Sequence, residues 1–269
     1  MSLAINATAA VGIAAQTTSL GSAALNSSTS TINATNVTVQ QAAPAAQSAS
    51  LASALKSLGM VAGLAGDLQK VAAALVPSMQ TTIQDRPDLA TASFDFQSDH
   101  GAIKVVSSSL GDSDKAWLEK TLNANQGLVD AVQVFHDDAT TSYGLWADAG
   151  GQSLSPSDTD KVSALADHSF SFMSMFQGAS EAMLQSVDPH ASYVTSHGAP
   201  INFHQGVNSA LSFLVFQKSN QAVLDGTNTS TNGSHVSHGA LKGNLFSGGG
   251  IPSFLPSLSS HSVGLSATA

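Results

Sequence analysis

Histidine residues recur regularly between residues 188 and 204 of this sequence, and one aspartate lies at the start of this range. His190, His197 and His204 are spaced seven residues apart, and Asp188 precedes them. Imidazole and carboxylate groups are common metal ligands, so a loop that gathers them could bind an ion. A continuous helix would align the three imidazoles, but a glycine and a proline between the last two favour a broken connection. We interpret these histidines as ordinary loop and cap residues and predict no metal site.

A second candidate is the stretch WADAGGQSLSPSDTD (146–160), which has the outline of a calcium loop. An EF-hand needs oxygen ligands at loop positions 1, 3, 5 and 12 and a glycine at position 6. A loop that starts at Asp148 has Gly150 at position 3 and Ser153 at position 6. The alternative register leaves Asp158 as its only carboxylate ligand. Neither register can neutralise a divalent cation.

The same stretch has the features of a joint between two helices. Ser155 suits a helix N-cap, Pro156 the first helical position and Asp158 the third. The pair Gly150-Gly151 supplies the left-handed backbone that reverses the chain. We therefore predict a helix that begins near Pro156.

Two further stretches place a histidine next to an aspartate in the sequence, as a general acid–base pair could. In His136-Asp137-Asp138, successive residues on a helix point about 100° apart, so we expect His136 not to face Asp137 and the trio to lie on solvated surface. Asp99-His100 is expected to form a turn.

No catalytic motif emerges from the rest of the chain. There is no G-x-S-x-G, P-loop or G-x-G-x-x-G pattern, and S-x-x-K occurs at Ser53–Lys56 without a matching second motif. The only glutamates are Glu119 and Glu181, and there is no cysteine. The sequence therefore predicts no catalytic residue and no cofactor-binding residue.

The charge balance limits the kinds of partner that this protein can bind. About a tenth of the chain is charged, nine Lys+Arg stand against eighteen Asp+Glu, and the formal net charge is −9. Nucleic-acid binding needs clustered basic residues that displace counterions from phosphates, and none occur. Polar residues also interrupt every window of about 20 residues that could cross a bilayer, so we expect no transmembrane segment.

The chain divides into three regions. Residues 1–55 contain no charged side chain and are rich in Ala, Ser, Thr and Asn, so we expect residues 1–50 to be a disordered arm. Residues 226–269 are rich in Gly and Ser, which predicts a flexible tail. The folded domain is expected over residues 51–225.

The clearest helical pattern lies at the start of this domain. Apolar residues recur at spacings of three and four and predict a helix that ends at Pro77. We interpret the stripe as the face of a bundle helix or as a surface that binds a partner or a second copy: Leu51, Leu55, Leu58, Val61, Leu64, Leu68, Val71 and Leu75.

Four more helices are expected downstream. They are marked by Trp117–Leu122, by Leu128 to Ala139, by one long helix from Val162 to Met183, and by a centrally placed helix from Val207 to Val215. Alternating residues on either side of His100-Gly101 predict a small β-hairpin over 94–106. The fold class is mainly α: an irregular bundle of about five helices, with one hairpin, between two disordered arms.

In composition the chain is similar to harpins, which are cysteine-free, acidic, Gly/Ser-rich proteins exported by bacterial type III systems. An uncharged, Ser/Asn/Thr-rich start is typical of such export substrates. The resemblance implies a secreted or cell-surface protein that lacks a Sec signal peptide, although the strongly patterned middle domain departs from a low-complexity harpin. A cytoplasmic location is the alternative.

The leading hypothesis is a non-enzymatic, exported bacterial interaction protein whose helical domain binds a protein partner or forms a homo-oligomer. One alternative is a helical hydrolase that uses His and Asp from residues 99–100 and 188–204. Another is a surface or matrix protein that assembles through the Leu51–Leu75 stripe.

Overall fold

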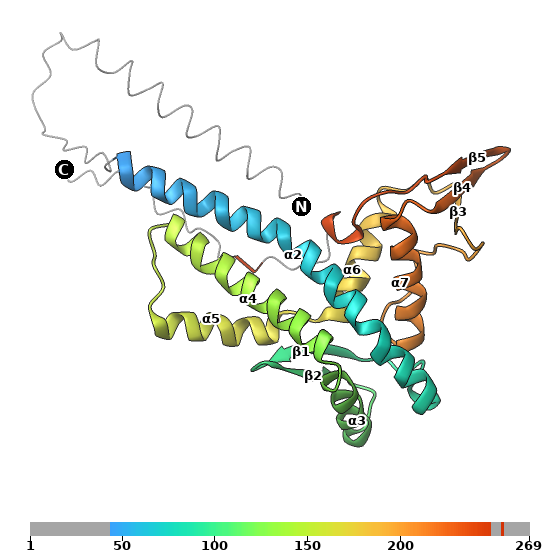
Figure 1. Cartoon of the computed structure of the whole chain (residues 1–269), viewed down its shortest axis with the longest axis horizontal. Coiled ribbons are helices and arrows are strands. Elements are labelled where there is room, and N and C mark those ends of the chain that lie inside the picture. The colour runs from blue at the N-terminus through green and yellow to red at the C-terminus, as the bar shows by residue number, and fades with distance from the viewer. Residues whose placement is uncertain (1–43, 249–253, 256–269) are drawn as a thin grey trace, which may run out of the picture. The chain divides into compact units, whose positions relative to one another are not determined.

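A computed structural model describes residues 44–248 and 254–255 of the chain (Figure 1). The expected fold class is confirmed: the described part is mainly helical and contains a small β-hairpin. The helices are α2 (Pro44–Asp85), α3 (Asp112–Asn123), α4 (Gln126–Ala149), α5 (Pro156–Ser169), α6 (Phe172–Leu184) and α7 (Ala210–Leu224), with short 3₁₀ helices at Pro87–Leu89 and Leu245–Gly248.

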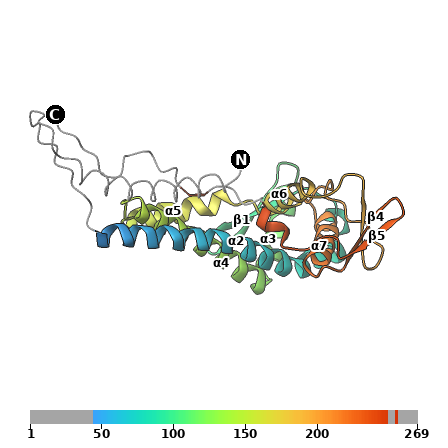
Figure 2. The same cartoon turned by 90° about the horizontal axis from the view of Figure 1, so that it is seen from above.

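The long helix α2 is the element around which the others pack. It contacts α4 along much of its length, and its C-terminal half also contacts α3 and α7 (Figures 1 and 2). The expectation of disorder over residues 1–50 is wrong for residues 44–50, which form the first turns of α2; residues 1–43 lie outside the described part.

Pro77 lies inside α2, so the expected helix end at this residue is wrong. Proline removes one backbone hydrogen bond and crowds the preceding turn, which costs about 3 kcal/mol in a helix interior. The following turn compensates by packing: Ser78, Met79 and Thr82 are buried, and the Thr82 hydroxyl donates to the Ser78 carbonyl at 2.9 Å.

The expected hairpin is confirmed as β1 (Asp95–Asp99) and β2 (Ala102–Val106), an antiparallel pair. His100 and Gly101 form its two-residue turn with φ values of +52° and +82°. Two positive φ angles are characteristic of the turns that match the twist of a hairpin. The alternating residues Phe96, Ile103 and Val105 point into the core.

The expected long helix over 162–183 is two helices, α5 and α6, separated at Phe170 and Ser171. A residue distant in sequence stabilises the break. Asp95 on β1 accepts hydrogen bonds from the backbone amides of Met173 at 2.8 Å and Ser174 at 3.0 Å, in the first turn of α6. Phe170 itself is buried, so the break also places an aromatic ring in the core.

A second sheet is formed by β3 (Ser192–Thr195), β4 (Asn228–Asn232) and β5 (His235–His238). The strands are antiparallel in the order β3-β4-β5. The predicted flexible tail from residue 226 is therefore wrong for residues 228–247: these contain two strands, and Leu241, Leu245 and Phe246 are buried. Most of the predicted tail beyond them lies outside the described residues.

Aromatic rings form much of the core. Phe176 packs against Phe213, Phe216 and Phe246 with ring centroids 5.4 to 6.1 Å apart, which joins α6, α7 and the second 3₁₀ helix. The expected central position of α7 is only partly right, because Leu211 and Val215 on its outer side are exposed.

Candidate functional site

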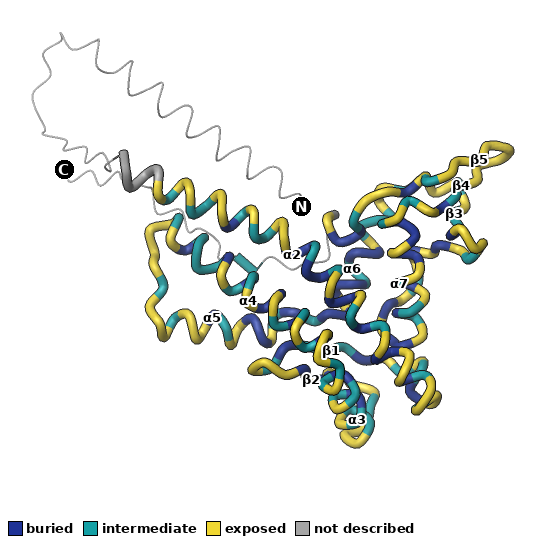
Figure 3. The backbone as a smooth tube through the Cα atoms, in the orientation of Figure 1, coloured by how far each residue is buried: buried dark blue, intermediate teal, exposed yellow. Residues whose placement is uncertain are grey.

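The eight apolar residues of the predicted stripe on α2 do not lie on one face. The last residues of the stripe are in the core, where Leu64 is 2% exposed and Leu68, Val71 and Leu75 are 0% exposed. At the other end, Leu51 is 58% and Leu55 is 60% exposed. Leu58 and Val61 are half-buried (Figure 3). The core residues therefore cannot form a partner-binding surface. Only the exposed residues at the N-terminal end of the stripe are accessible to a partner.

The spacing explains the split. Residues on an α-helix rotate by about 100° each, so alternating steps of four and three residues stay on one face. Between Leu58 and Leu64 the stripe takes two consecutive steps of three through Val61, which turns it by about 120° in total. The first leucines therefore belong to a second face, which we call the outer face: Leu51, Leu55, Leu58, Gly59, Ala62 and Gly63.

The outer face points away from the rest of the folded unit. On the opposite side of the same turns, Ser57 is buried, and its hydroxyl donates to the Ser142 carbonyl of α4 at 2.7 Å. On the outer face itself, no described atom beyond the glycine's neighbours and the helix's own backbone lies within 4 Å of a Cβ placed on Gly59 or Gly63. The surface is thus apolar and open, while the helix that bears it is anchored by α4.

By length and composition alone, Ala49–Asp85 is apolar enough to cross a membrane. Only 17% of its most apolar 18-residue window is buried. The C-terminal part of the same helix contributes Leu68, Val71 and Leu75 to the core, as a helix of a folded unit does. The expected lack of a membrane-spanning segment stays a prediction.

Two carboxylates meet where α2 packs on α4. The buried side chain of Asp67 contacts Asp138, and Lys70 contacts Asp67 Oδ1 at 2.8 Å. Burial raises the pKa of Asp138, and a hydrogen bond and the like charge of Asp67 raise it further. The hydrogen bond that Lys70 donates to Asp67 raises the pKa of Lys70. Burial and the neighbouring Asp67 therefore favour the protonated form of the Asp138 carboxyl group.

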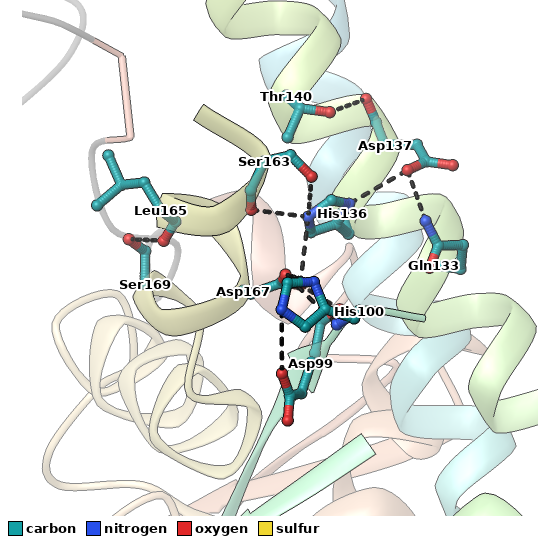
Figure 4. A network of polar contacts seen from close by, with 11 residues as sticks. Asp99, His100, Gln133, His136, Asp137, Thr140, Ser163, Leu165, Asp167 and Ser169 are labelled. Atoms are coloured by element: carbon teal, nitrogen blue, oxygen red, sulfur yellow. Dashed lines mark hydrogen bonds and ion pairs between the residues drawn. The ribbon is translucent and has the colours of Figure 1, made fainter. Parts of the chain in front are cut away.

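A polar network centred on His136 joins α4, α5 and the hairpin (Figure 4). His136 Nε2 lies 3.1 Å from the Ser163 carbonyl oxygen and 3.4 Å from Asp167 Oδ1. Ser98 Oγ of β1 donates to Asp167 Oδ1 at 2.8 Å. The side chains of His136 and Asp167 are only 8% and 5% exposed.

The expectation that His136 is solvated surface is therefore wrong, and so is the expectation that it does not face Asp137. His136 Nδ1 lies 3.1 Å from Asp137 Oδ1. The sequence does contain the signal for its burial: His136 follows Val132 by four residues and precedes Ala139 by three, and both are in the core.

This network has the residue types of a catalytic site, but its central side chains are nearly closed to solvent. Neither His136 nor Asp167 lines any of the five best-formed hollows of the described part of the chain. A general base must reach a proton of the substrate, and these two side chains face packed protein. The contacts of the network fix α5 against α4 and β1.

The remaining histidine candidates are not brought together. His190, His197 and His204 are all exposed, and within the described residues no three His, Asp or Glu side chains are grouped as metal ligands. Asp188 instead accepts hydrogen bonds from the His190 backbone amide and from the Asn232 side chain.

The Asp99-His100 turn likewise lies apart from residues 188–204. The His100 ring instead lies near Asp167, with His100 Nδ1 3.6 Å from Asp167 Oδ2. The β1–β2 turn and β3 are well separated in both ribbon views (Figures 1 and 2). The convergence required by the hydrolase hypothesis is therefore not found among these residues.

A hollow of about 700 Å³ lies between α2 and α7. Its walls include Pro77, Leu214 and Lys218, with Ser196 and His197 from the segment after β3. The Ser196 hydroxyl is 3.2 Å from His197 Nδ1. The carboxylate on the wall, Asp225, accepts a hydrogen bond from the Gln221 side chain. Asp225 therefore does not orient the imidazole of His197 as the acid of a catalytic triad would.

The loop over 146–160 is a helix joint, as expected. The Ser155 hydroxyl oxygen accepts from the Asp158 amide at 3.2 Å, and the hydroxyl donates to Asp158 Oδ2 at 2.6 Å. Gly151 has a φ of +77°. Lys161 and then Ser155 lower the pKa of Asp158, so its carboxylate serves the helix end.

Comparisons with protein-family models, curated proteins and solved structures gave no match. The site therefore has to be interpreted from its own geometry.

Proposed function

We propose that this chain is a non-enzymatic interaction protein whose binding surface is the outer face of α2. The observation that carries the proposal is the exposure of Leu51 and Leu55, at 58% and 60%, on a helix that α4 holds in place. Exposed leucines on an anchored helix are a common form of protein-binding surface, because they supply apolar area without a large loss of conformational entropy on binding.

A site-specific photocrosslinker tests the surface. Replacement of Leu55 by benzoylphenylalanine should give covalent adducts with a protein on irradiation of the producing cells and their medium. The matched control is the same replacement of Leu165, which is 52% exposed on α5. If the two positions give the same pattern, or neither gives an adduct, the outer face is not a specific binding surface.

We further propose that the protein is exported from a bacterial cell and that residues 1–55 act as the export signal. The support is compositional: residues 1–55 contain no charged side chain, and the first is Lys56. The test is to fuse residues 1–55 to a reporter enzyme and to measure the reporter in the medium. Export no greater than that of the reporter alone would contradict the proposal.

Assembly on a surface or in a matrix is the second candidate. The same outer face favours it, since a surface that binds a second copy can also build a larger assembly.

A further inference from the structure

We propose that Tyr143 and Phe170 form a peptide-binding site, which we call the aromatic site, and that the chain's own Phe254 is its resident ligand. The partner that fits this site is an uncharged peptide segment in which a phenylalanine is followed by a leucine. Such a segment exchanges with the chain's own. The aromatic site goes beyond the outer face of α2, because its two residues belong to α4 and to the break between α5 and α6.

Phe254 lies between two aromatic rings that are distant from it in the sequence. Its ring centroid is 5.4 Å from that of Tyr143 and 5.1 Å from that of Phe170, and both pairs are tilted. Aromatic pairs at such distances attract each other beyond the gain from burial alone. Phe254 and the following Leu255 are half-buried and lie beside α4 (Figure 1). The seated ring shows which kind of side chain this surface accepts.

The walls of the aromatic site are held by contacts that do not involve Phe254. Phe170 packs edge-on against Phe135 of α4, with ring centroids 5.0 Å apart and an interplanar angle of 85°. Next to Phe135, His136 Nε2 lies 3.1 Å from the Ser163 carbonyl oxygen, a contact that joins α4 to α5. A site whose walls are already in place loses little conformational entropy when a ligand binds. We therefore expect the site to stay formed when Phe254 leaves it.

The sequence around Phe254 has the properties of a short peptide ligand. Residues 243–269 contain no Asp, Glu, Lys or Arg, so a protein with a formal net charge of −9 does not repel the segment. Pro252 and Pro256 flank the pair Phe254-Leu255. Proline restricts the backbone of a free peptide and so lowers the entropy that is lost on binding. We expect partner segments of the same kind, with Phe-Leu between prolines.

A short tether makes the chain's own segment a competitor of such partners. Residues 249–253 join Phe254 to the second 3₁₀ helix, which ends at Gly248. A short linker gives an effective concentration on the order of 1 mM. If a free peptide binds the empty site with a Kd of about 0.1 mM, the tethered segment weakens its binding to the natural chain about tenfold.

Fluorescence anisotropy with a labelled peptide tests the site in the full chain. The probe has the sequence of residues 251–258, IPSFLPSL. Phe254→Ala empties the site, so this variant should bind the probe about tenfold more tightly than the natural chain does. A probe with alanine in place of its phenylalanine should bind neither chain. Circular dichroism shows whether the variant keeps its helices. If it does not, Phe254→Leu replaces it, because leucine keeps an apolar side chain without the ring.

A change in the wall locates the binding. Tyr143→Ala, added to Phe254→Ala, should weaken binding of the probe at least tenfold, because it removes one of the two rings. The matched control adds Val134→Ala to Phe254→Ala. Val134 is 45% exposed and lies nine residues before Tyr143, about two and a half turns, so it is on the opposite side of α4. The control should leave binding unchanged.

Equal binding of the probe by the natural chain and the Phe254 variant, or binding by neither, overturns the proposal. Binding that Tyr143→Ala leaves unchanged, or that Val134→Ala weakens equally, also overturns it. Failure here is distinct from failure of the proposed function, because crosslinking at Leu55 reports on the outer face of α2 alone.

Discussion

His136 Nε2 lies 3.4 Å from Asp167 Oδ1, in a region where both side chains are nearly excluded from solvent. The pair joins α4 to α5, and Ser98 extends it to β1. Residues of this kind would be expected in an active site, but here they face packed protein. Their function is to position α5.

Removal of one partner of this pair should destabilise the fold. Asp167→Ala leaves the Ser98 hydroxyl without its buried acceptor and removes the carboxylate beside His136, so we expect a loss of about 2 kcal/mol in the free energy of unfolding. Asp137→Ala removes the exposed partner of the same histidine and should cost less than about 1 kcal/mol. Urea unfolding measures both losses. Equal losses would show that the buried contact contributes no more to stability than the exposed one.

The raised pKa of Asp138 predicts that the stability of the fold depends on pH. Because the pKa of Asp138 is raised in the folded protein, the folded state binds this proton more tightly than the unfolded state does. The contribution of this carboxyl to stability is therefore present below its usual value of 3.8 and is lost as the pH rises through the raised pKa.

Asp138→Asn should remove that dependence. Relative to the natural chain, the variant should gain stability as the pH rises from about 3 to 7, because it keeps a neutral group beside Asp67 throughout. Urea unfolding over this pH range gives the comparison. Asp160→Asn, at an exposed aspartate of α5, serves as the control, and the same pH profile in both variants would contradict the raised pKa of Asp138.

The proline inside α2 offers a gain in stability. Pro77→Ala supplies the missing backbone amide at an exposed position of the helix, so we expect a stabilisation of about 1–3 kcal/mol. Pro156→Ala is the matched control, since proline is well suited to the first position of α5 and little gain is expected there. Thermal unfolding distinguishes them; a destabilised Pro77→Ala would show that the local backbone requires proline.

The N-cap of α5 should contribute independently. Ser155→Ala removes the acceptor of the Asp158 amide and should cost about 1 kcal/mol. Ser157→Ala, two residues inside the same helix, lacks this role and is the control. Equal melting temperatures of the two variants would contradict the capping assignment.

Local patterns were predictable from the sequence. The hairpin turn at His100-Gly101 and the cap at Ser155 depend on residues within a few positions of one another, and both are present. The core stripe of α4 follows from the spacing of Leu128, Val132, Phe135 and Ala139, all of which are buried.

Long-range contacts were not predictable in this way. The break at Phe170 is stabilised by Asp95, far away in sequence, and the burial of His136 depends on Asp167. The β4–β5 hairpin did have a local signal that was overlooked: a two-residue turn at Gly233-Ser234, with Gly233 at a φ of +59°.

The division of the α2 stripe was present in its spacing but was not recognised as a change of face. Eight residues at steps of three and four look continuous in the sequence. The three successive steps of three from Leu55 to Leu64 turn the N-terminal leucines away from α4. This division is the basis of the proposed binding surface.

Unfolding of two alanine variants tests that division most directly. Leu68→Ala should lower the free energy of unfolding by about 2–5 kcal/mol, because it creates a cavity in the core. Leu55→Ala, measured on monomeric protein at low concentration, should change it by less than about 0.5 kcal/mol. A loss at Leu55 as large as that at Leu68 would place both leucines in the core and contradict an outer face.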